Sequence, residues 1–245
     1  MKSGSKILFF CVALIILFNF NIYAVQNSEE LSVIEYNQLA SERLQQAGLF
    51  YDRWQNSGDA ENFQQAIIYA ASAAETRPDW DEPWLLLGML YSELKTDEEA
   101  MELAVEALIN AVDINPANAR AQILLANVLL EQGRFYSAIE QYKSLFAKNE
   151  SMINGLTITP LTIAYIADGR IEAGIIYLEE LKELYPMNYS IRIGLAVLLK
   201  NSGELYAARD ILAGLIVDNA FREDINLSEA EKNYVNNLLE SWKEG

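Results

Sequence analysis

A repeated register of apolar residues and glycines constrains this chain more than any other feature of its sequence. From Leu31 onward the apolar residues show no convincing two-residue alternation, and they form helical runs that Gly, Pro or Asn separates. Equivalent positions in three successive segments recur at spacings of 36 and then 34 residues: Leu125, Leu161 and Leu195; Leu129, Tyr165 and Leu199; Gly133, Gly169 and Gly203; Tyr142, Leu178 and Leu212. Helical runs that repeat at this period predict a stack of helix pairs, in which each pair buries a face against its neighbours.

Small residues recur in the same register on both helices of each predicted pair. They are Ala126, Thr162 and Ala196 on the first helices, and Ala138, Gly174 and Ala208 on the second helices. Side chains of this size let two helix axes approach closely. The repeats therefore predict an all-α fold that is held together by helix-on-helix packing, with no sheet.

The preceding segment contains the most specific motif. A W-x-x-L-G-x-x-Y pattern is followed by a small residue and a closing proline, at Trp84, Leu87, Gly88, Tyr91, Ala104 and Pro116. This pattern resembles the tetratricopeptide repeat. The resemblance implies a tetratricopeptide-repeat helical-hairpin solenoid over residues 33–243, with about five helix pairs and a C-terminal capping helix. The expected units are 34–79, 81–118, 119–153, 155–188 and 189–221, and the capping helix is 228–243.

Two helix starts can be predicted from local chemistry. Thr159 precedes Pro160, and Thr can cap a helix whose first position is Pro, so the first helix of the fourth unit is expected to start late and to be short. Ser228 with Glu231 forms a capping-box pattern that opens the closing helix. That helix is expected to direct four large side chains toward the last repeat: Tyr234, Leu238, Leu239 and Trp242.

The first 24 residues follow the pattern of a signal peptide. Lys2 and Lys6 precede an apolar run from Ile7 to Phe18, which is shorter than the roughly 20 residues that span a bilayer. Cleavage after Ala24 is expected, with a short linker at 25–32. In the alternative, residues 7–25 are retained as a membrane anchor. The protein is therefore predicted to be exported to the periplasm or cell envelope.

Composition argues against most catalytic chemistry. The chain has no histidine, and its one cysteine, Cys11, lies in the leader, so the usual acid/base group, thiolate nucleophile and Cys/His zinc site are not expected. The formal net charge of −17 disfavours nucleic-acid binding. The adjacent acidic pairs Glu98-Glu99 and Glu179-Glu180 are expected to face solvent, because neighbours on a helix point about 100° apart. No cofactor, metal or enzymatic activity is predicted.

The resemblance also implies a binding surface. In this family the first helices of successive units form a concave groove that grips a segment of a partner protein. Mapped through the register, the groove contains Leu85, Met89, Ile123, Asn127, Leu130, Ile163, Ile166, Ile193 and Val197. The competing interpretation is that many of these side chains pack between helices.

The sequence leaves two candidate functions, which differ in where the protein is located. The first is a non-catalytic scaffold or adaptor that binds a protein partner in an extracytoplasmic compartment. The second is an accessory subunit of a larger envelope complex, anchored by the uncleaved leader. The partner is a protein or peptide in both, and contact with a membrane is expected only if the leader is retained.

Overall fold

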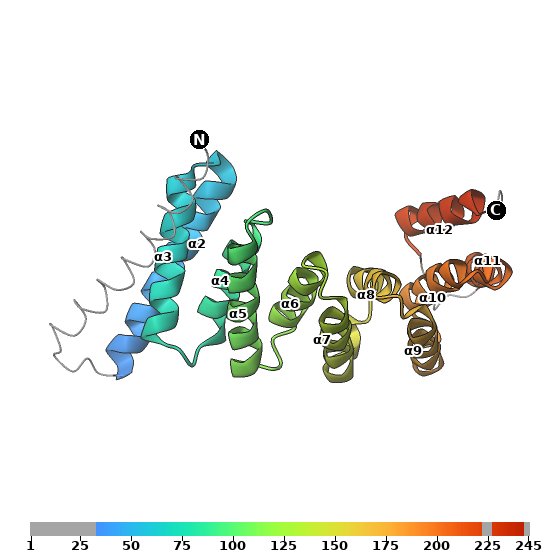
Figure 1. The fold of residues 1–245 in the computed structure, drawn as a ribbon, viewed down its shortest axis with the longest axis horizontal. Helices are drawn as coiled ribbons and strands as arrows, with labels where there is room; N and C mark the ends of the chain where they lie inside the picture. The colour runs from blue at the N-terminus through green and yellow to red at the C-terminus, as the bar shows by residue number, and fades with distance from the viewer. Residues whose placement is uncertain (1–32, 222–226, 243–245) are drawn as a thin grey trace. The chain divides into compact units, whose positions relative to one another are not determined.

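The computed structural model describes residues 33–221 and 227–242, and these form eleven α-helices and one 3₁₀ helix with no strand (Figure 1). The predicted signal peptide 1–24, the linker 25–32 and the end of the predicted capping helix at Lys243 lie outside the described residues. The all-helical prediction is confirmed. The chain divides into two compact units, one up to Thr96 and one from Asp97, so the division falls inside the predicted repeat 81–118.

The first unit contains α2 (Val33–Ser57), α3 (Ala60–Thr76) and α4 (Asp81–Ser92). The long α2 packs along α3 through alanines, with Ala40 and Ala47 of α2 fully buried. Asp59 begins α3, because its side chain accepts a hydrogen bond from the backbone N–H of Glu61 at 3.0 Å. Small buried side chains thus bring the first two helices close together along much of their length.

The second unit continues the pattern of paired helices. It contains α5 (Glu98–Ile114), α6 (Ala119–Glu131), α7 (Phe135–Lys148), η1 (Glu150–Met152), α8 (Gly155–Ala167), α9 (Ile171–Leu184), α10 (Tyr189–Ser202), α11 (Leu205–Phe221) and α12 (Glu229–Ser241). Helix α6 packs on α7, and α10 packs on α8, α9 and α11. Each element therefore contacts close neighbours in the chain, as a stack of hairpins requires.

The recurring glycines end the first helix of each pair. Gly133, Gly169 and Gly203 have positive φ angles of 71°, 70° and 98°. In each turn the N–H of the next residue donates to a carbonyl five residues back, as Arg134 does to Leu129 at 2.8 Å. This is the Schellman arrangement, and its left-handed position strongly favours glycine.

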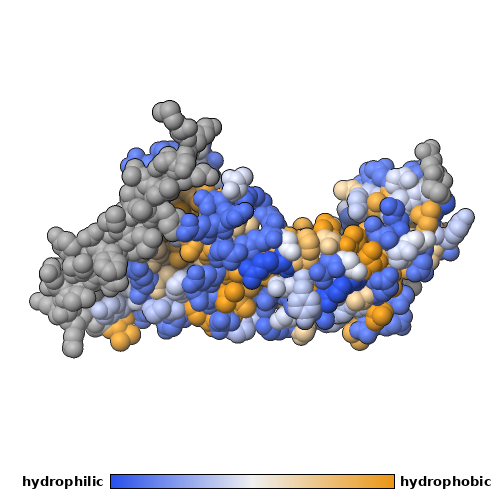
Figure 2. Space-filling view, viewed as in Figure 1, coloured by the Kyte–Doolittle hydropathy of each residue, from blue (hydrophilic) through white to orange (hydrophobic). Residues whose placement is uncertain are grey.

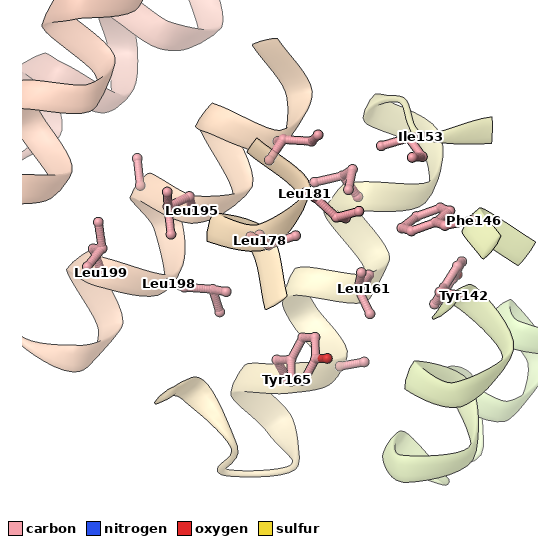
Figure 3. Close-up of a cluster of buried hydrophobic side chains, with 14 of the residues drawn as sticks. Tyr142, Phe146, Ile153, Leu161, Tyr165, Leu178, Leu181, Leu195, Leu198 and Leu199 are labelled. Atoms are coloured by element: carbon pink, nitrogen blue, oxygen red, sulfur yellow. The ribbon is translucent and has the colours of Figure 1, made fainter. Parts of the chain in front are cut away.

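The leucines predicted to stack form the core of the second unit. Leu125, Leu161 and Leu195 are 1%, 0% and 0% exposed. Figure 3 shows Leu161 of α8, Leu178 of α9 and Leu195 of α10 among the clustered apolar side chains. Burial of these side chains supplies the main driving force for folding of the unit.

The start of α8 differs from the prediction. The helix begins at Gly155, and Asn154 caps it by accepting from the N–H of Leu156 at 2.9 Å, while Thr157 Oγ1 accepts from the N–H of Asn154 at 3.3 Å. Pro160 lies inside the helix. The prediction of a late, short helix capped by Thr159 was wrong, because the reciprocal Asn154–Thr157 bonds form a complete cap one turn earlier.

The closing helix begins as predicted, but its buried face differs by one residue from the predicted face. The capping box of Ser228 and Glu231 is present, and Trp242 is buried. Tyr234 is 47% exposed, however, whereas Val235 is fully buried. The assignment of Tyr234 to the packed face was wrong, since Val235 holds the position in phase with Leu238, Leu239 and Trp242.

Within residues 33–221 and 227–242, no helix combines the length and the apolar character needed to cross a membrane.

Candidate functional site

The predicted groove residues divide between the two units. Leu85 and Met89 lie on α4 in the first unit, and the other seven lie on α6, α8 and α10 in the second. We name these seven residues the α6–α8–α10 surface: Ile123, Asn127, Leu130, Ile163, Ile166, Ile193 and Val197. Leu85 and Met89 belong to the first unit and are not part of this surface.

Exposure varies strongly across the predicted residues. Ile163 is 51% exposed, whereas Ile123, Leu130, Ile166, Ile193 and Val197 are half-buried and pack against the core of the unit. On α4, Leu85 is buried at 7% exposure and Met89 is half-buried. The aliphatic members of the surface therefore serve the core in part, and Ile163 is the member that presents most apolar area to solvent.

The side chain of Asn127 already makes one hydrogen bond within the protein. Its Oδ1 accepts a hydrogen bond from the hydroxyl of Tyr142 on α7. The Tyr142 side chain is fully buried, and burial raises the pKa of its hydroxyl. Asn127 therefore anchors the Tyr142 hydroxyl through Oδ1, and its Nδ2 is the donor that remains for a partner.

Two exposed positions in the same register were not predicted. Thr159 stands 36 residues after Ile123, and Lys200 stands 34 residues after Ile166, and both side chains are exposed. The register itself could have identified them. Thr159 was missed because it was assigned to a helix cap.

Leu156 is a third exposed residue on α8 that the prediction omitted. It is 83% exposed and lies in the first turn of the helix, one turn before Thr159. The late start predicted for α8 excluded Leu156 from the helix altogether. With the observed start, α8 offers two exposed aliphatic side chains, Leu156 and Ile163.

Charge distinguishes α8 from its partner α9. Helix α8 has no charged residue between Gly155 and Ala167, whereas its partner α9 exposes Glu172, Glu179, Glu180 and Glu183. Figure 2 shows the surface of the second unit hollowed beside α12, with apolar residues gathered at the base of the hollow. An uncharged apolar surface on a strongly acidic chain is a feature typical of interaction sites.

Acidic side chains of the described residues were compared with what a metal site requires. Among the residues described, no group of three or more His, Cys, Asp and Glu side chains could hold a metal ion. The acidic pairs Glu98-Glu99 and Glu179-Glu180 are exposed, as predicted.

Solved structures share this architecture. The chain superimposes on a crystal structure of MamA with a TM-score of 0.56, covering 78% of this chain and 98% of that chain at 16% identity. It superimposes on residues 41 to the end of MamA from Desulfovibrio magneticus RS-1 with a TM-score of 0.50, covering 73% and 97% at 17% identity. No protein-family model matches the sequence, and no curated protein matches it.

These neighbours define the class as an all-α solenoid of helical hairpins. The chain has the tetratricopeptide-repeat fold, as the sequence motif implied. Identities of 16% and 17% establish a shared fold, and a shared fold does not carry a function over to this chain.

Proposed function

We propose that this chain is a non-catalytic scaffold that binds a segment of another protein on the α6–α8–α10 surface. The fold supports an interaction role, since stacked hairpins create extended surfaces rather than closed reaction sites. The observation that carries the proposal is Ile163, which is 51% exposed at the middle of a helix without charged residues. A partner that covers Ile163 and Leu156 would remove apolar area from water.

The chemistry of the surface indicates the kind of segment. Half-buried aliphatic side chains flank Ile163, and Thr159 and the Asn127 Nδ2 group supply hydrogen-bonding capacity. An apolar segment or the apolar face of an amphipathic helix would match this surface. The side chains already packed against the core need little reordering on binding, which lowers the entropic cost.

A site-specific crosslink can identify the partner. A photoreactive residue at position 163 in the native host should capture one protein that the same residue at position 176 does not capture. Ile176 is the matched control, because it is 59% exposed but lies on α9, outside the α6–α8–α10 surface.

Affinity then tests the surface quantitatively. Ile163→Glu should weaken binding of the captured partner by about tenfold or more, because burying one aliphatic side chain is worth roughly 1.5 to 3 kcal/mol. Ile176→Glu should leave affinity unchanged, and both variants should melt close to wild type. Equal affinity of wild type and Ile163→Glu would refute the proposed surface.

We propose an extracytoplasmic location on the basis of the leader pattern in residues 1–24. The second candidate keeps residues 7–25 as an anchor and makes the chain an accessory subunit of an envelope complex. Its specific support is that Phe20, Ile22 and Tyr23 extend the apolar run. Both candidates use the same binding surface and differ only in what happens to the leader.

A further inference from the structure

The first unit contains a shallow pocket, wide open to solvent, that the proposed function does not use. It has a volume of about 390 Å³ and is lined by Trp54, Gln55, Gly58 and Glu93. Trp54 and Gln55 come from the last turn of α2, Gly58 from the α2–α3 turn, and Glu93 follows the last residue of α4. Three segments of the unit therefore meet at this pocket.

Aromatic neighbours hold the indole of Trp54 in place. Its ring stacks on Tyr51 at 5.6 Å between centroids with 28° between the planes, and it packs on Phe63 at 4.7 Å. Phe63 is buried at 7% exposure, so the indole rests on the core of the unit. A ring supported in this way presents a fixed wall to the pocket at little entropic cost.

Glu93 contributes the charge of the pocket. The side chain is exposed, and its Oε1 accepts a hydrogen bond from the hydroxyl of Tyr51 at 3.3 Å. A carboxylate can accept about four hydrogen bonds, so most of its capacity remains. Arg53, which precedes Trp54 in the chain, does not line the pocket, and its guanidinium lies over the ring of Phe50 at 5.2 Å from the centroid.

Gly58 keeps one side of the pocket open. Its φ angle is 69°, and apart from the glycine itself and its two chain neighbours no atom lies within 4 Å of the position that a Cβ would occupy. An aromatic wall, a carboxylate and the Gln55 amide are thus accessible from solvent. Cations are attracted both to the face of an indole and to a carboxylate, whereas an anion would be repelled by Glu93 and by the net charge of −17.

We propose that this pocket binds the ammonium or guanidinium group of a Lys or Arg side chain carried by a partner protein. The cation lies against the Trp54 indole and pairs with Glu93, while the Gln55 amide oxygen accepts one of its hydrogen bonds. The site lies in the first unit, so it is independent of the α6–α8–α10 surface and adds a charged contact to an apolar one.

The test uses the indole N–H signals of the ¹⁵N-labelled native protein in NMR spectra, with Trp54→Phe identifying the Trp54 signal. Nα-acetyl-arginine amide should shift the Trp54 signal with a dissociation constant on the order of 10 mM, as expected for one exposed cation–π contact and one exposed ion pair. Nα-acetyl-lysine amide should act similarly. The neutral isostere Nα-acetyl-citrulline amide should not shift the signal.

Matched variants separate a specific pocket from general attraction to an acidic chain. Glu93→Gln should weaken the arginine titration about fivefold, whereas Glu82→Gln, an exposed glutamate at the other end of α4, should leave it unchanged. Both positions are exposed, so both variants should keep the wild-type melting temperature. The proposal is overturned if arginine amide leaves Trp54 unmoved, if citrulline amide shifts it equally, or if the two glutamine variants behave alike.

Discussion

Single glycines set how closely the helices of the second unit approach. A Cβ on Gly194 of α10 would lie 2.7 Å from Ile158 Cγ2 and 2.9 Å from Thr162 Oγ1, both on α8. A Cβ on Gly174 of α9 would lie 2.8 Å from Tyr165 Cγ. Distances below 3 Å require neighbouring atoms to move, so these two positions admit only hydrogen without repacking.

Replacement of Gly194 tests this close approach. Gly194→Ala should destabilise the protein by about 1 to 3 kcal/mol, because the new methyl group overpacks the α8–α10 contact. Gly48→Ala on α2 is the control, since nothing lies within 4 Å of its Cβ position, and it should stabilise by roughly 0.5 to 1 kcal/mol through helix propensity. Chemical denaturation measures both. Stabilisation by both substitutions would show that α8 and α10 are not in tight contact at Gly194.

Residue exposure was the property hardest to predict for the binding surface. The register placed Ile123 and Ile163 on the same face of successive first helices, yet Ile163 is 51% exposed and Ile123 packs partly against the core. Asn127 was assigned to the groove, but its Oδ1 accepts a hydrogen bond from Tyr142 inside the protein. Helical period predicts the direction of a side chain, whereas exposure depends on which neighbours reach it.

At the scale of elements, α12 shows how a terminal helix is attached. Tyr189 at the start of α10 donates a hydrogen bond to Glu231, and the N–H of Leu227 donates to Asn219 Oδ1 at 2.7 Å. The Glu231 bond, with some burial, raises the pKa of Tyr189 to about 12, and the same bond lowers the pKa of Glu231. Polar contacts at its first turn thus support the apolar packing of Val235 and Trp242.

The raised pKa of Tyr189 predicts a loss of stability in alkali. The neutral hydroxyl is favoured in the folded state, so its contribution is complete below about pH 10, the ordinary tyrosine pKa, and is lost as pH rises toward 12. Tyr189→Phe should cost about 1 kcal/mol at pH 8 and should then lose less stability than wild type between pH 8 and pH 11.

Thermal melts at the two pH values provide the measurement. Tyr234→Phe is the matched control, because Tyr234 lies on α12 and is 47% exposed, and it should follow wild type at both pH values. Burial also raises the pKa of Tyr142 and Tyr177, so wild type weakens in alkali for more than one reason. An identical loss for wild type and Tyr189→Phe would exclude a titrating contact between α10 and α12.

Local sequence signals predicted that a helix forms more reliably than they predicted the residue at which it begins. The Ser228–Glu231 cap and the glycine turns at Gly133, Gly169 and Gly203 were readable because each is formed within a few residues. The start of α8 was not, since two competing caps, Asn154 and Thr159, stand five residues apart. Local chemistry allowed both, and the completed capping box with Thr157 decided between them.

For the whole molecule, we propose that the fate of residues 1–24 determines where the chain acts. If these residues are cleaved as a signal peptide, we expect the acidic repeat domain to be released outside the cytoplasm. If residues 7–25 remain, the same domain is held beside a membrane. The two outcomes place the α6–α8–α10 surface before different sets of partners.

Intact mass of the native protein distinguishes these outcomes. We expect a chain that begins at Val25 and is lighter than 27.6 kDa by roughly 2.7 kDa, the mass of a 24-residue signal peptide. It should be recovered in the soluble extracytoplasmic fraction. A full-length mass in the membrane fraction would support the anchored accessory subunit and contradict release.

Sequence alone determined the all-helical class, the paired helices, the stacking leucines and the turn glycines, because these depend on periodicity and on short-range backbone conformation. Only the tertiary structure decided that Gly194 needs to be glycine, that Asn127 holds Tyr142, that Ile163 is the exposed member of its surface, and that Trp54 and Glu93 share a pocket. Each of these depends on residues from different helices meeting in space. The spacing of residues along the sequence predicts the direction of each side chain. The distances between helices depend on how the helices pack.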